Sequence, residues 1–499
     1  MSAAPPPNIL LVMADQLAAG VPADAPAMDG LTADGVSFDA AYCPSPLCAP
    51  SRAAMLTGLL PSRTGVFDNA AEMRASLPTV THHLRAAGYA TTLAGKMHFV
   101  GPDQHHGFEE RLTPDVYPAG LEWTPDWRAG PDERLPWYHT MGSVLEPAAT
   151  PASMQTDYDD EVAFHAKRAL FDHARRRAGD PFFLVASFTH PHDPWEVPQR
   201  FWDRYDAEAV PMPAVGPIPL EEADPHSRRL RAMSGIDAAD LTEEQIRVAR
   251  HGYLASVSFV DERIGRVLAA LAESGLEENT IVVLTADHGE MLGERGLWFK
   301  MAFFEGSARV PLVVRLPRRT RAGTRVTRPV SLLDLMPTLL ALAGLEVPEG
   351  LDGTSLAGLL SGDDGGPEEV VAEYLAEGAC DPAVMVRRGA HKYIRCGADP
   401  ELLYDLEADP HELRDLAAAE PEVLASLRAA ADARWDLDAL RARVLASQDE
   451  RRTVLAALGR GRPHPWDFRP EGDGRYVSTG GDLYDLQRRA RLGPPGFGG

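Results

Sequence analysis

Short apolar runs alternate with longer amphipathic segments along most of the chain, and this alternation is the feature that most constrains its fold. The apolar runs have the length of buried strands, and the amphipathic segments have the periodicity of helices. Such a pattern is typical of an α/β protein whose sheet is covered by helices on both faces. We predict strands at residues 8–15, 89–95, 182–190, 280–286 and 310–316, and helices at residues 78–87, 242–274 and 332–343.

The length of 499 residues exceeds what one small core organises, which favours two domains. Residues 346–367 are rich in glycine and aspartate and are predicted to form a linker. Strands are predicted after it at residues 368–374, 383–388 and 392–396, and a helical segment at 420–458. We therefore expect a catalytic domain at residues 1–365, a small α+β domain at 366–460 and an extended arm at 461–499.

Charge and composition exclude several classes of function. The net charge of −24 argues against a nucleic-acid partner and tolerates a substrate that carries a positive group. The N-terminus has no basic region, and the apolar run at residues 9–14 is too short to span a membrane. A disulfide scaffold is unlikely for a chain of this length with four cysteines. We expect a cytoplasmic protein without a membrane partner.

Three predicted strands end in polar residues that can carry chemistry, namely Asp15, the segment His190–His192 and Asp287-His288. In open α/β sheets, ligands bind outside the carboxyl ends of the strands, so we expect these residues to share one site. Asp15, Gln16, Asp287 and His288 offer mostly oxygen ligands for a divalent cation. The imidazole favours manganese or magnesium over calcium, although a capping aspartate beside a surface histidine would give the same local pattern.

Cationic residues lie close to these strand ends in sequence. Lys96 and His98 follow a predicted strand and lie on one face of an extended segment. Only four of the 49 basic residues are lysines, so a lysine that persists indicates a position where a compact ammonium is needed. With Arg52 and Lys300, Lys96 forms the cation set that a sulfate or phosphate ester requires, and His192 is a possible general acid.

The segment Cys48-Ala-Pro-Ser-Arg52 combines a thiol, a proline and an arginine at fixed offsets. Ser51 is a possible helix N-cap in this segment. A thiol at a helix N-terminus beside an arginine has a low pKa and is a candidate nucleophile. A buried structural cysteine would explain the thiol but not the proline and arginine.

This segment resembles the signature of the type I sulfatases, in which the cysteine is oxidised to formylglycine. Longer stretches at residues 62–72, 95–110, 187–195, 287–311 and 463–467 resemble the choline sulfatase branch of that family. The resemblance implies an alkaline-phosphatase-like mixed sheet sandwiched by helices, a smaller C-terminal α+β domain and an extended C-terminal arm. It also implies a divalent metal (manganese, calcium or magnesium) and modification of Cys48 by a formylglycine-generating enzyme.

The resemblance further implies a role for each residue of the site. Residue 48, as the aldehyde hydrate, would bind the metal and attack sulfur, with Asp15, Gln16, Asp287 and His288 as the other ligands. Arg52 and Lys96 would hold the nucleophile and the sulfate oxygens. His192 and Lys300 would assist the leaving group, and His98 would accept the proton that allows sulfate to depart.

Recognition of choline requires aromatic faces and carboxylates, because a quaternary ammonium group has no hydrogen-bond donor. Trp123 and Glu377 match the aromatic contact and the carboxylate of the resembled family, and Asn69 matches a donor to a sulfate oxygen. The resemblance also implies an acidic contact from the C-terminal arm, for which the sequence leaves Asp482, Tyr484 and Asp485 open. The arm mediates subunit contacts in that family, which implies a homotetramer.

Two alternatives to a choline-O-sulfate hydrolase stay open at this point. One is a phosphonate or phosphate monoester hydrolase, or another alkyl or aryl sulfatase, because these enzymes use a similar metal and nucleophile set. The other is a binding module for a quaternary ammonium compound, which would follow if Cys48 stays unmodified.

Overall fold

The computed structural model describes residues 5–117, 119–130, 134–135, 137–177, 179–462, 466 and 487. An eight-stranded sheet forms its centre, with the strand order β12-β2-β11-β9-β1-β7-β4-β5. In that order the strands are Thr324–Val326, Val36–Phe38, Leu312–Arg315, Thr280–Thr285, Asn8–Ala14, Phe182–Phe188, Ala90–Gly95 and Glu110–Arg111.

The middle of this sheet is parallel. β1 pairs in parallel with β7 on one side and with β9 on the other, and β4 pairs in parallel with β7. Every residue of β1, β7 and β9 is buried, which explains why these strands are continuous apolar runs rather than alternating ones. β11 runs antiparallel to β9, so the sheet is mixed. The carboxyl ends of β1, β4, β7 and β9 meet at one edge.

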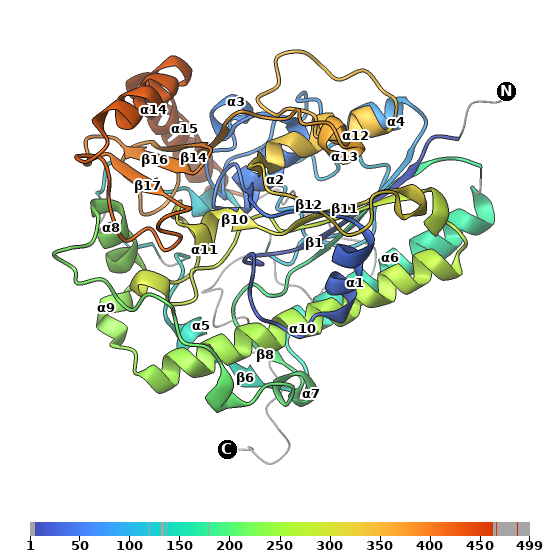
Figure 1. Cartoon of the computed structure of the whole chain (residues 1–499), viewed down its shortest axis with the longest axis horizontal. Coiled ribbons are helices and arrows are strands. Elements are labelled where there is room, and N and C mark those ends of the chain that lie inside the picture. Colours follow the sequence, from blue (N-terminus) through green and yellow to red (C-terminus); the bar gives the residue numbers. More distant parts are fainter. Residues whose placement is uncertain are drawn as a thin grey trace.

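Helices cover both faces of the sheet (Figure 1). One face carries α1 (Pro26–Asp34), α6 (Met154–Arg176) and α10 (Glu243–Glu273). The other face carries α2 (Cys48–Thr57), α4 (Val80–Ala86) and α12 (Leu335–Leu342). The predicted capping box at the start of α10 is present. The Thr242 side chain accepts from the Gln245 backbone N–H, and the Gln245 side-chain oxygen accepts from the Thr242 backbone N–H.

A smaller antiparallel sheet follows toward the C-terminus. It has the order β14 (Val370–Tyr374), β15 (Ala383–Arg388), β16 (His391–Cys396) and β17 (Leu402–Asp405). The helical segment predicted at residues 420–458 is two helices, α14 (Pro421–Arg434) and α15 (Leu437–Leu458), because the chain leaves the helical conformation at Trp435 and Asp436. The expected α/β fold with a small C-terminal α+β part is confirmed.

Two other predictions are corrected in detail. The predicted strand at residues 310–316 is interrupted at Pro311, so that β10 (Arg309–Val310) and β11 belong to different sheets. The predicted linker at residues 346–367 contains a short helix, α13 (Ala357–Ser361). The remaining short elements are β3 (Ala41–Tyr42), α3 (Pro61–Thr64), α5 (Gly142–Leu145), β6 (Ala148–Ala149), β8 (Glu196–Val197), α7 (Gln199–Trp202), α8 (Pro225–Ser234), α9 (Ile236–Ala239), α11 (Glu305–Ala308) and β13 (Val330–Ser331).

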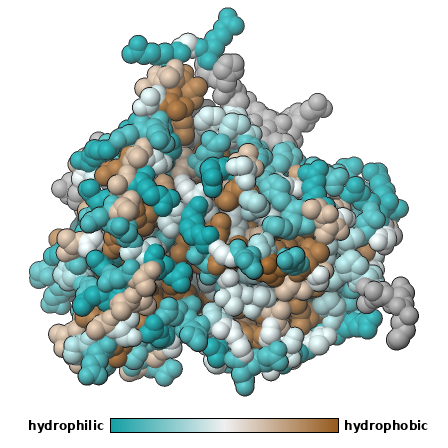
Figure 2. All heavy atoms as spheres, turned by 90° about the horizontal axis from the view of Figure 1, so that it is seen from above, coloured by the Kyte–Doolittle hydropathy of each residue, from teal (hydrophilic) through white to brown (hydrophobic). Residues whose placement is uncertain are grey.

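The surface in Figure 2 is mostly hydrophilic, and apolar residues appear on it in several separate groups. Within the described part of the chain, no helix is both long and apolar enough to cross a membrane. In open α/β sheets, ligands bind at the carboxyl ends of the parallel strands, so the loops that follow β1, β4, β7 and β9 are expected to form the functional site.

Candidate active site

Cys48 is the first residue of α2 and is buried. The expected N-cap at Ser51 is wrong, because the helix already begins at Cys48 after an extended Leu47. Ser51 lies inside the helix, where its hydroxyl donates to the Asp287 carbonyl oxygen at 2.6 Å. The Asn69 side-chain oxygen accepts from the Ala49 N–H at 3.0 Å and so satisfies one of the backbone N–H groups that have no partner within the helix. The thiol thus sits where the helix dipole favours negative charge.

Four potential metal ligands meet at Cys48. Asp15 follows β1, and Asp287 and His288 follow the neighbouring strand β9. One ligand atom from each of these residues and the Cys48 sulfur all lie within 4.8 Å of one another, and all four residues are buried. Two carboxylates and an imidazole at this separation fit a divalent cation.

The predicted fifth ligand, Gln16, lies beside this group with its side chain engaged elsewhere. Its backbone N–H donates to Asp287 Oδ1 at 3.1 Å, and its side-chain oxygen accepts from the Lys300 ammonium. The Gln16 amide nitrogen donates to Asp193 and to Glu290. Gln16 therefore connects the metal-ligand group to the opposite wall of the site.

Two cations balance the carboxylates. Arg52 Nε donates to Asp287 Oδ2 at 2.8 Å, and Lys96 Nζ contacts Asp15 Oδ2 and lies 3.7 Å from the Cys48 sulfur. Burial alone raises the pKa of the Cys48 thiol, but the charges of Lys96, Lys300 and His288 outweigh burial and hold this pKa well below its usual range. The sequence pattern pointed to the helix N-terminus and Arg52, whereas Lys96, Lys300 and His288 have the largest lowering effects on this pKa in the structure.

Lys300 and His192 form a second polar wall. Lys300 Nζ lies 3.0 Å from His192 Nε2. His192 Nδ1 lies 2.7 Å from the Asp193 carbonyl oxygen, which can only accept, so Nδ1 carries the proton and Nε2 accepts from Lys300. The residues on either side of Lys300, Phe299 and Met301, have φ of 66° and 79°. This backbone conformation costs free energy, and its presence at a buried lysine marks a functional position.

His98 lies at the carboxyl end of β4 and is buried. Neither of its ring nitrogens has a hydrogen-bond partner among the described residues. Its backbone N–H donates to Asp115 Oδ2 at 2.6 Å, which fixes the turn in which His98 has a φ of 58°. An imidazole with both nitrogens unengaged is available to accept a proton from a bound group.

Aromatic side chains continue the site beyond His98. The His98 ring meets the Trp123 ring edge-on at 6.2 Å, and Trp123 is stacked on Trp137 with a centroid distance of 5.7 Å and an interplanar angle of 1°. Trp123 ends the short helix η1 (Leu121–Trp123) and is only partly buried, so part of its surface is open.

Glu377 is buried close behind β14, and its Oε2 has no hydrogen-bond partner within the described ranges. Burial raises the pKa of Glu377 to about 8. The segment is held near Trp123 because the Trp127 indole N–H donates to the Ala376 carbonyl oxygen at 3.0 Å. A buried carboxylate without a partner is costly, and such groups mark ligand sites.

The three arm residues considered for the substrate cation, Asp482, Tyr484 and Asp485, lie outside the described residues. Gln487 is described, and its amide donates to the Tyr117 hydroxyl at 2.8 Å. The Tyr117 ring lies under Lys96 Nζ, which is 4.8 Å from the ring centroid. Gln487 therefore lies at the wall of the site.

Sequence reasoning missed several residues of this site. Glu290, Trp137 and Tyr117 had local signals, since Glu290 lies two residues after His288 and both aromatic residues lie in segments rich in aromatic and proline residues. Asp115 had none, because its role depends on the close approach of its loop to the β4 turn.

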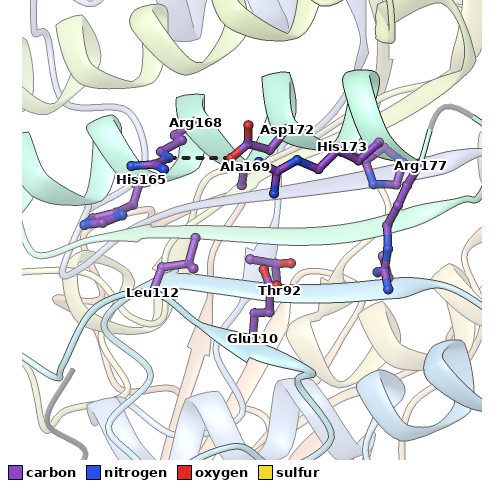
Figure 3. Close-up of a pocket in the computed structure, with 11 residues that line it drawn as sticks. Thr92, Glu110, Leu112, His165, Arg168, Ala169, Asp172, His173 and Arg177 are labelled. Carbon is purple, nitrogen blue, oxygen red and sulfur yellow. Dashed lines mark ion pairs between the residues drawn. The ribbon is translucent and has the colours of Figure 1, made fainter. Parts of the chain in front are cut away.

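A separate surface groove of about 440 Å³ lies between α6 and β4 (Figure 3). Its lining includes Thr92, His165, Arg168 and Asp172, and Arg168 pairs with Asp172 at 3.5 Å. It contains none of the residues described above, and it adjoins the first half of β4 rather than its carboxyl end.

Comparisons with known proteins agree with this geometry. The sulfatase family model matches residues 7–345. A model of the C-terminal part of N-sulphoglucosamine sulphohydrolase matches residues 293–431, and a model of the C-terminal part of choline sulfatase matches residues 442–492. The chain is 46% identical to a choline-sulfatase from Rhizobium meliloti over 97% of its own length and 98% of that protein.

Among solved structures, a phosphonate monoester hydrolase from Silicibacter pomeroyi matches with a TM-score of 0.69 at 26% identity, covering 92% of this chain and 96% of that one. A 2-O GAG sulfatase matches with a TM-score of 0.66 at 24% identity, covering 90% of this chain and 94% of that one, which shows a common fold. The mixed sheet and the smaller antiparallel sheet are thus the alkaline-phosphatase-like fold of these enzymes. The chain therefore belongs to the sulfatase family.

Proposed function

We propose that this protein hydrolyses choline-O-sulfate to choline and sulfate, with formylglycine at position 48 as the nucleophile. The observation that carries the proposal is the buried carboxyl group of Glu377, whose Oε2 has no hydrogen-bond partner among the described residues. With the partly open aromatic face of Trp123, it lies close to the cationic site around residue 48. A sulfate ester fits the cationic part, and a trimethylammonium group fits the carboxylate and the aromatic face. The 46% identity to a choline-sulfatase supports the same substrate.

The ligand group fits a divalent metal, which would supply Lewis-acid polarisation of the sulfate ester and a lower pKa for the hydrated aldehyde. Asp15, Asp287, His288 and residue 48 would hold it. For Gln16 to join as the further ligand of the proposed set, its side-chain oxygen would have to exchange its contact with Lys300 for the metal. The Cys48 sulfur marks the place of the aldehyde oxygens. Manganese, magnesium and calcium all suit these donors, and the imidazole favours the first two.

The chain's own cations orient the reacting groups. Arg52 is fixed by Asp287, the Lys96 carbonyl oxygen and Ser187, so its position does not depend on the substrate. Lys96 reaches both Asp15 and position 48. Together they stabilise the negative charge on the nucleophile and on the sulfate oxygens. The Asn69 side-chain oxygen accepts from the Ala49 N–H of α2, which leaves its amide nitrogen to donate to the same sulfate oxygens.

Proton transfer is assigned to two groups in the site, the Lys300–His192 pair and His98. Choline is a poor leaving group, so its departing oxygen needs a proton or a nearby positive charge. Lys300 supplies that charge and proton on one wall, and His192, whose Nε2 accepts from Lys300 at 3.0 Å, orients the ammonium group. His98, with both ring nitrogens unengaged among the described residues, accepts the proton from the nucleophile side when sulfate is released.

A comparison of three esters tests the proposed function. Protein co-expressed with a formylglycine-generating enzyme should cleave choline-O-sulfate with a higher kcat/KM than 4-nitrophenyl sulfate. A cation–π contact and a buried carboxylate add roughly 2–3 kcal/mol, which corresponds to a preference of about 30- to 150-fold. A phosphonate monoester should be a poorer substrate than choline-O-sulfate. Equal or faster cleavage of the aryl sulfate or the phosphonate would keep the nucleophile and the metal site but overturn the substrate.

The pH dependence of choline binding tests the role of Glu377. Its pKa of about 8 means that the carboxyl is mostly protonated at neutral pH and becomes negative as the pH rises through 8. A cation binds the ionised form, whose fraction rises from about 3% at pH 6.5 to about 75% at pH 8.5, so choline affinity should increase about 25-fold over this range. Isothermal titration calorimetry of the wild type and of Glu377→Gln checks this. The variant should bind weakly and without this pH dependence, and parallel profiles in the two proteins would contradict the assignment.

Several finer points remain predictions from the sequence. They are the contact from Asp482, Tyr484 or Asp485, the homotetramer, the cytoplasmic location, the modifying enzyme as a partner and the division of the chain at residues 365 and 460. The contact of Gln487 with Tyr117 is consistent with a residue of this part of the chain lying near the substrate site.

A further inference from the structure

The helix α15 lies about 380 residues after the turn that contains Asp68, yet the two are in direct contact. The two guanidinium nitrogens of Arg451 donate to the two Asp68 carboxylate oxygens at 2.6 and 2.7 Å. Asp68 is fully buried, and Arg451 is 8% exposed. A parallel fork of this kind fixes both the distance and the plane of its two partners.

Arg451 also contacts a second loop of the site. Its Nη1 lies 3.3 Å from Thr124 Oγ1, and the Thr124 hydroxyl donates to the Leu121 carbonyl oxygen at 2.7 Å. Thr124 directly follows Trp123, and Asp68 directly precedes Asn69. A single guanidinium therefore connects the turn of the sulfate-side residue Asn69 with the short helix that ends in the aromatic residue Trp123.

The charge of Arg451 has a further consequence for Glu377. Asp68 is close enough to Glu377 for its negative charge to raise the pKa of the Glu377 carboxyl, after the larger effect of burial. The Arg451–Asp68 pair offsets part of that charge. Without the arginine, the site would hold a second uncompensated carboxylate next to Glu377.

We propose that Arg451 is a positioning residue for the site of the substrate cation: it holds Trp123 in register with Asn69 and offsets part of the charge of Asp68. The inference rests on the proposed function and assigns a role in catalysis to the C-terminal helix. Arg451 itself contacts no reacting group in this arrangement. Its loss should therefore affect a substrate with a trimethylammonium group far more than one without it.

Two variants separate positioning from folding. Arg451→Lys keeps the positive charge but cannot form the fork with Asp68 together with the contact to Thr124. The double variant Asp68→Asn/Arg451→Met removes both charges, so that no buried carboxylate is left unpaired. Arg452→Met is the matched control, because Arg452 is the next residue of α15 and donates to the Pro125 carbonyl oxygen of the same loop at 2.6 Å.

The measurements are kcat and KM for choline-O-sulfate and 4-nitrophenyl sulfate, choline affinity by calorimetry, and the melting temperature. In both test variants, KM for choline-O-sulfate should rise about tenfold and choline affinity should fall about tenfold, while kcat/KM for the aryl sulfate changes less than about threefold. Arg452→Met should leave all of these values within about twofold of the wild type.

Equal losses for both esters, or loss of folding in both test variants, would assign Arg451 to stability alone and overturn the proposal. Unchanged choline affinity in the test variants would also overturn it. If the wild type does not cleave choline-O-sulfate, the proposed function fails by that result. The same tenfold loss of choline affinity would then still support the positioning role, and an unchanged affinity would reject it.

Discussion

Replacing Cys48 by serine should abolish sustained turnover and lower kcat about 10³-fold or more, as is typical for the loss of a catalytic nucleophile. A serine offers one hydroxyl, whereas hydrated formylglycine offers two on the same carbon, and the second is needed to release sulfate. The buried cations Arg52 and Lys96 remain in place, so the variant should still bind its substrate. We expect at most one equivalent of choline per protein, measured by rapid-mixing product analysis.

Cys43→Ala is the control for this experiment. Cys43 is a buried thiol five residues earlier in the same segment, and burial raises its pKa far above the usual range, so it stays protonated. The control should retain wild-type turnover. Sustained turnover by Cys48→Ser at more than about a tenth of the wild-type rate would contradict the formylglycine mechanism.

Asp287→Asn should lower both metal content and activity. Asp287 contributes a carboxylate to the metal-ligand group and fixes Arg52 at 2.8 Å, and the substitution removes the negative charge while keeping a hydrogen-bond acceptor. A bound metal stabilises the transition state by several kcal/mol, so we expect kcat/KM to fall about 10³-fold. Metal content, measured by mass spectrometry after dialysis, should fall below about a tenth of the wild-type value.

Asp261→Asn tests whether such losses follow from any buried carboxylate. Asp261 of α10 accepts from the Ala27 and Met28 N–H groups at 3.1 and 2.8 Å, away from the site. It should keep its metal and its activity. Full metal content in Asp287→Asn, with or without activity, would exclude Asp287 as a ligand.

The positions of the four lysines show which features of the structure composition alone predicts. Of the four lysines, Lys96, Lys300 and Lys392 are buried, and only Lys167 is exposed. Lys392 contacts Glu305, Glu412 and the Phe303 carbonyl oxygen. The scarcity of lysine thus indicated positions that need a compact ammonium group. The partners of Lys392, however, come from two separate segments, residues 303–305 and Glu412, that no sequence pattern connected.

The sequence by itself determined the central sheet and the edge at which chemistry occurs. Strands buried on both faces must be continuous apolar runs, and parallel strands bring their carboxyl ends together, so Asp15, His192 and Asp287 were correctly expected to converge. These features depend on local hydrophobicity and on the alternation of strands with helices, both of which can be read from the order of residues in the sequence.

Only the tertiary structure decided the helix start at Cys48 and the surroundings of the substrate cation. Ser51 has the side chain of an N-cap, but the helix begins three residues earlier, and the Asn69 side chain accepts from the Ala49 N–H in its first turn. Trp123, Glu377 and Arg451 come from segments more than 70 residues apart. Their proximity results from packing of α15 and the small sheet on the main body, and such long-range contacts leave no periodic signal in the sequence.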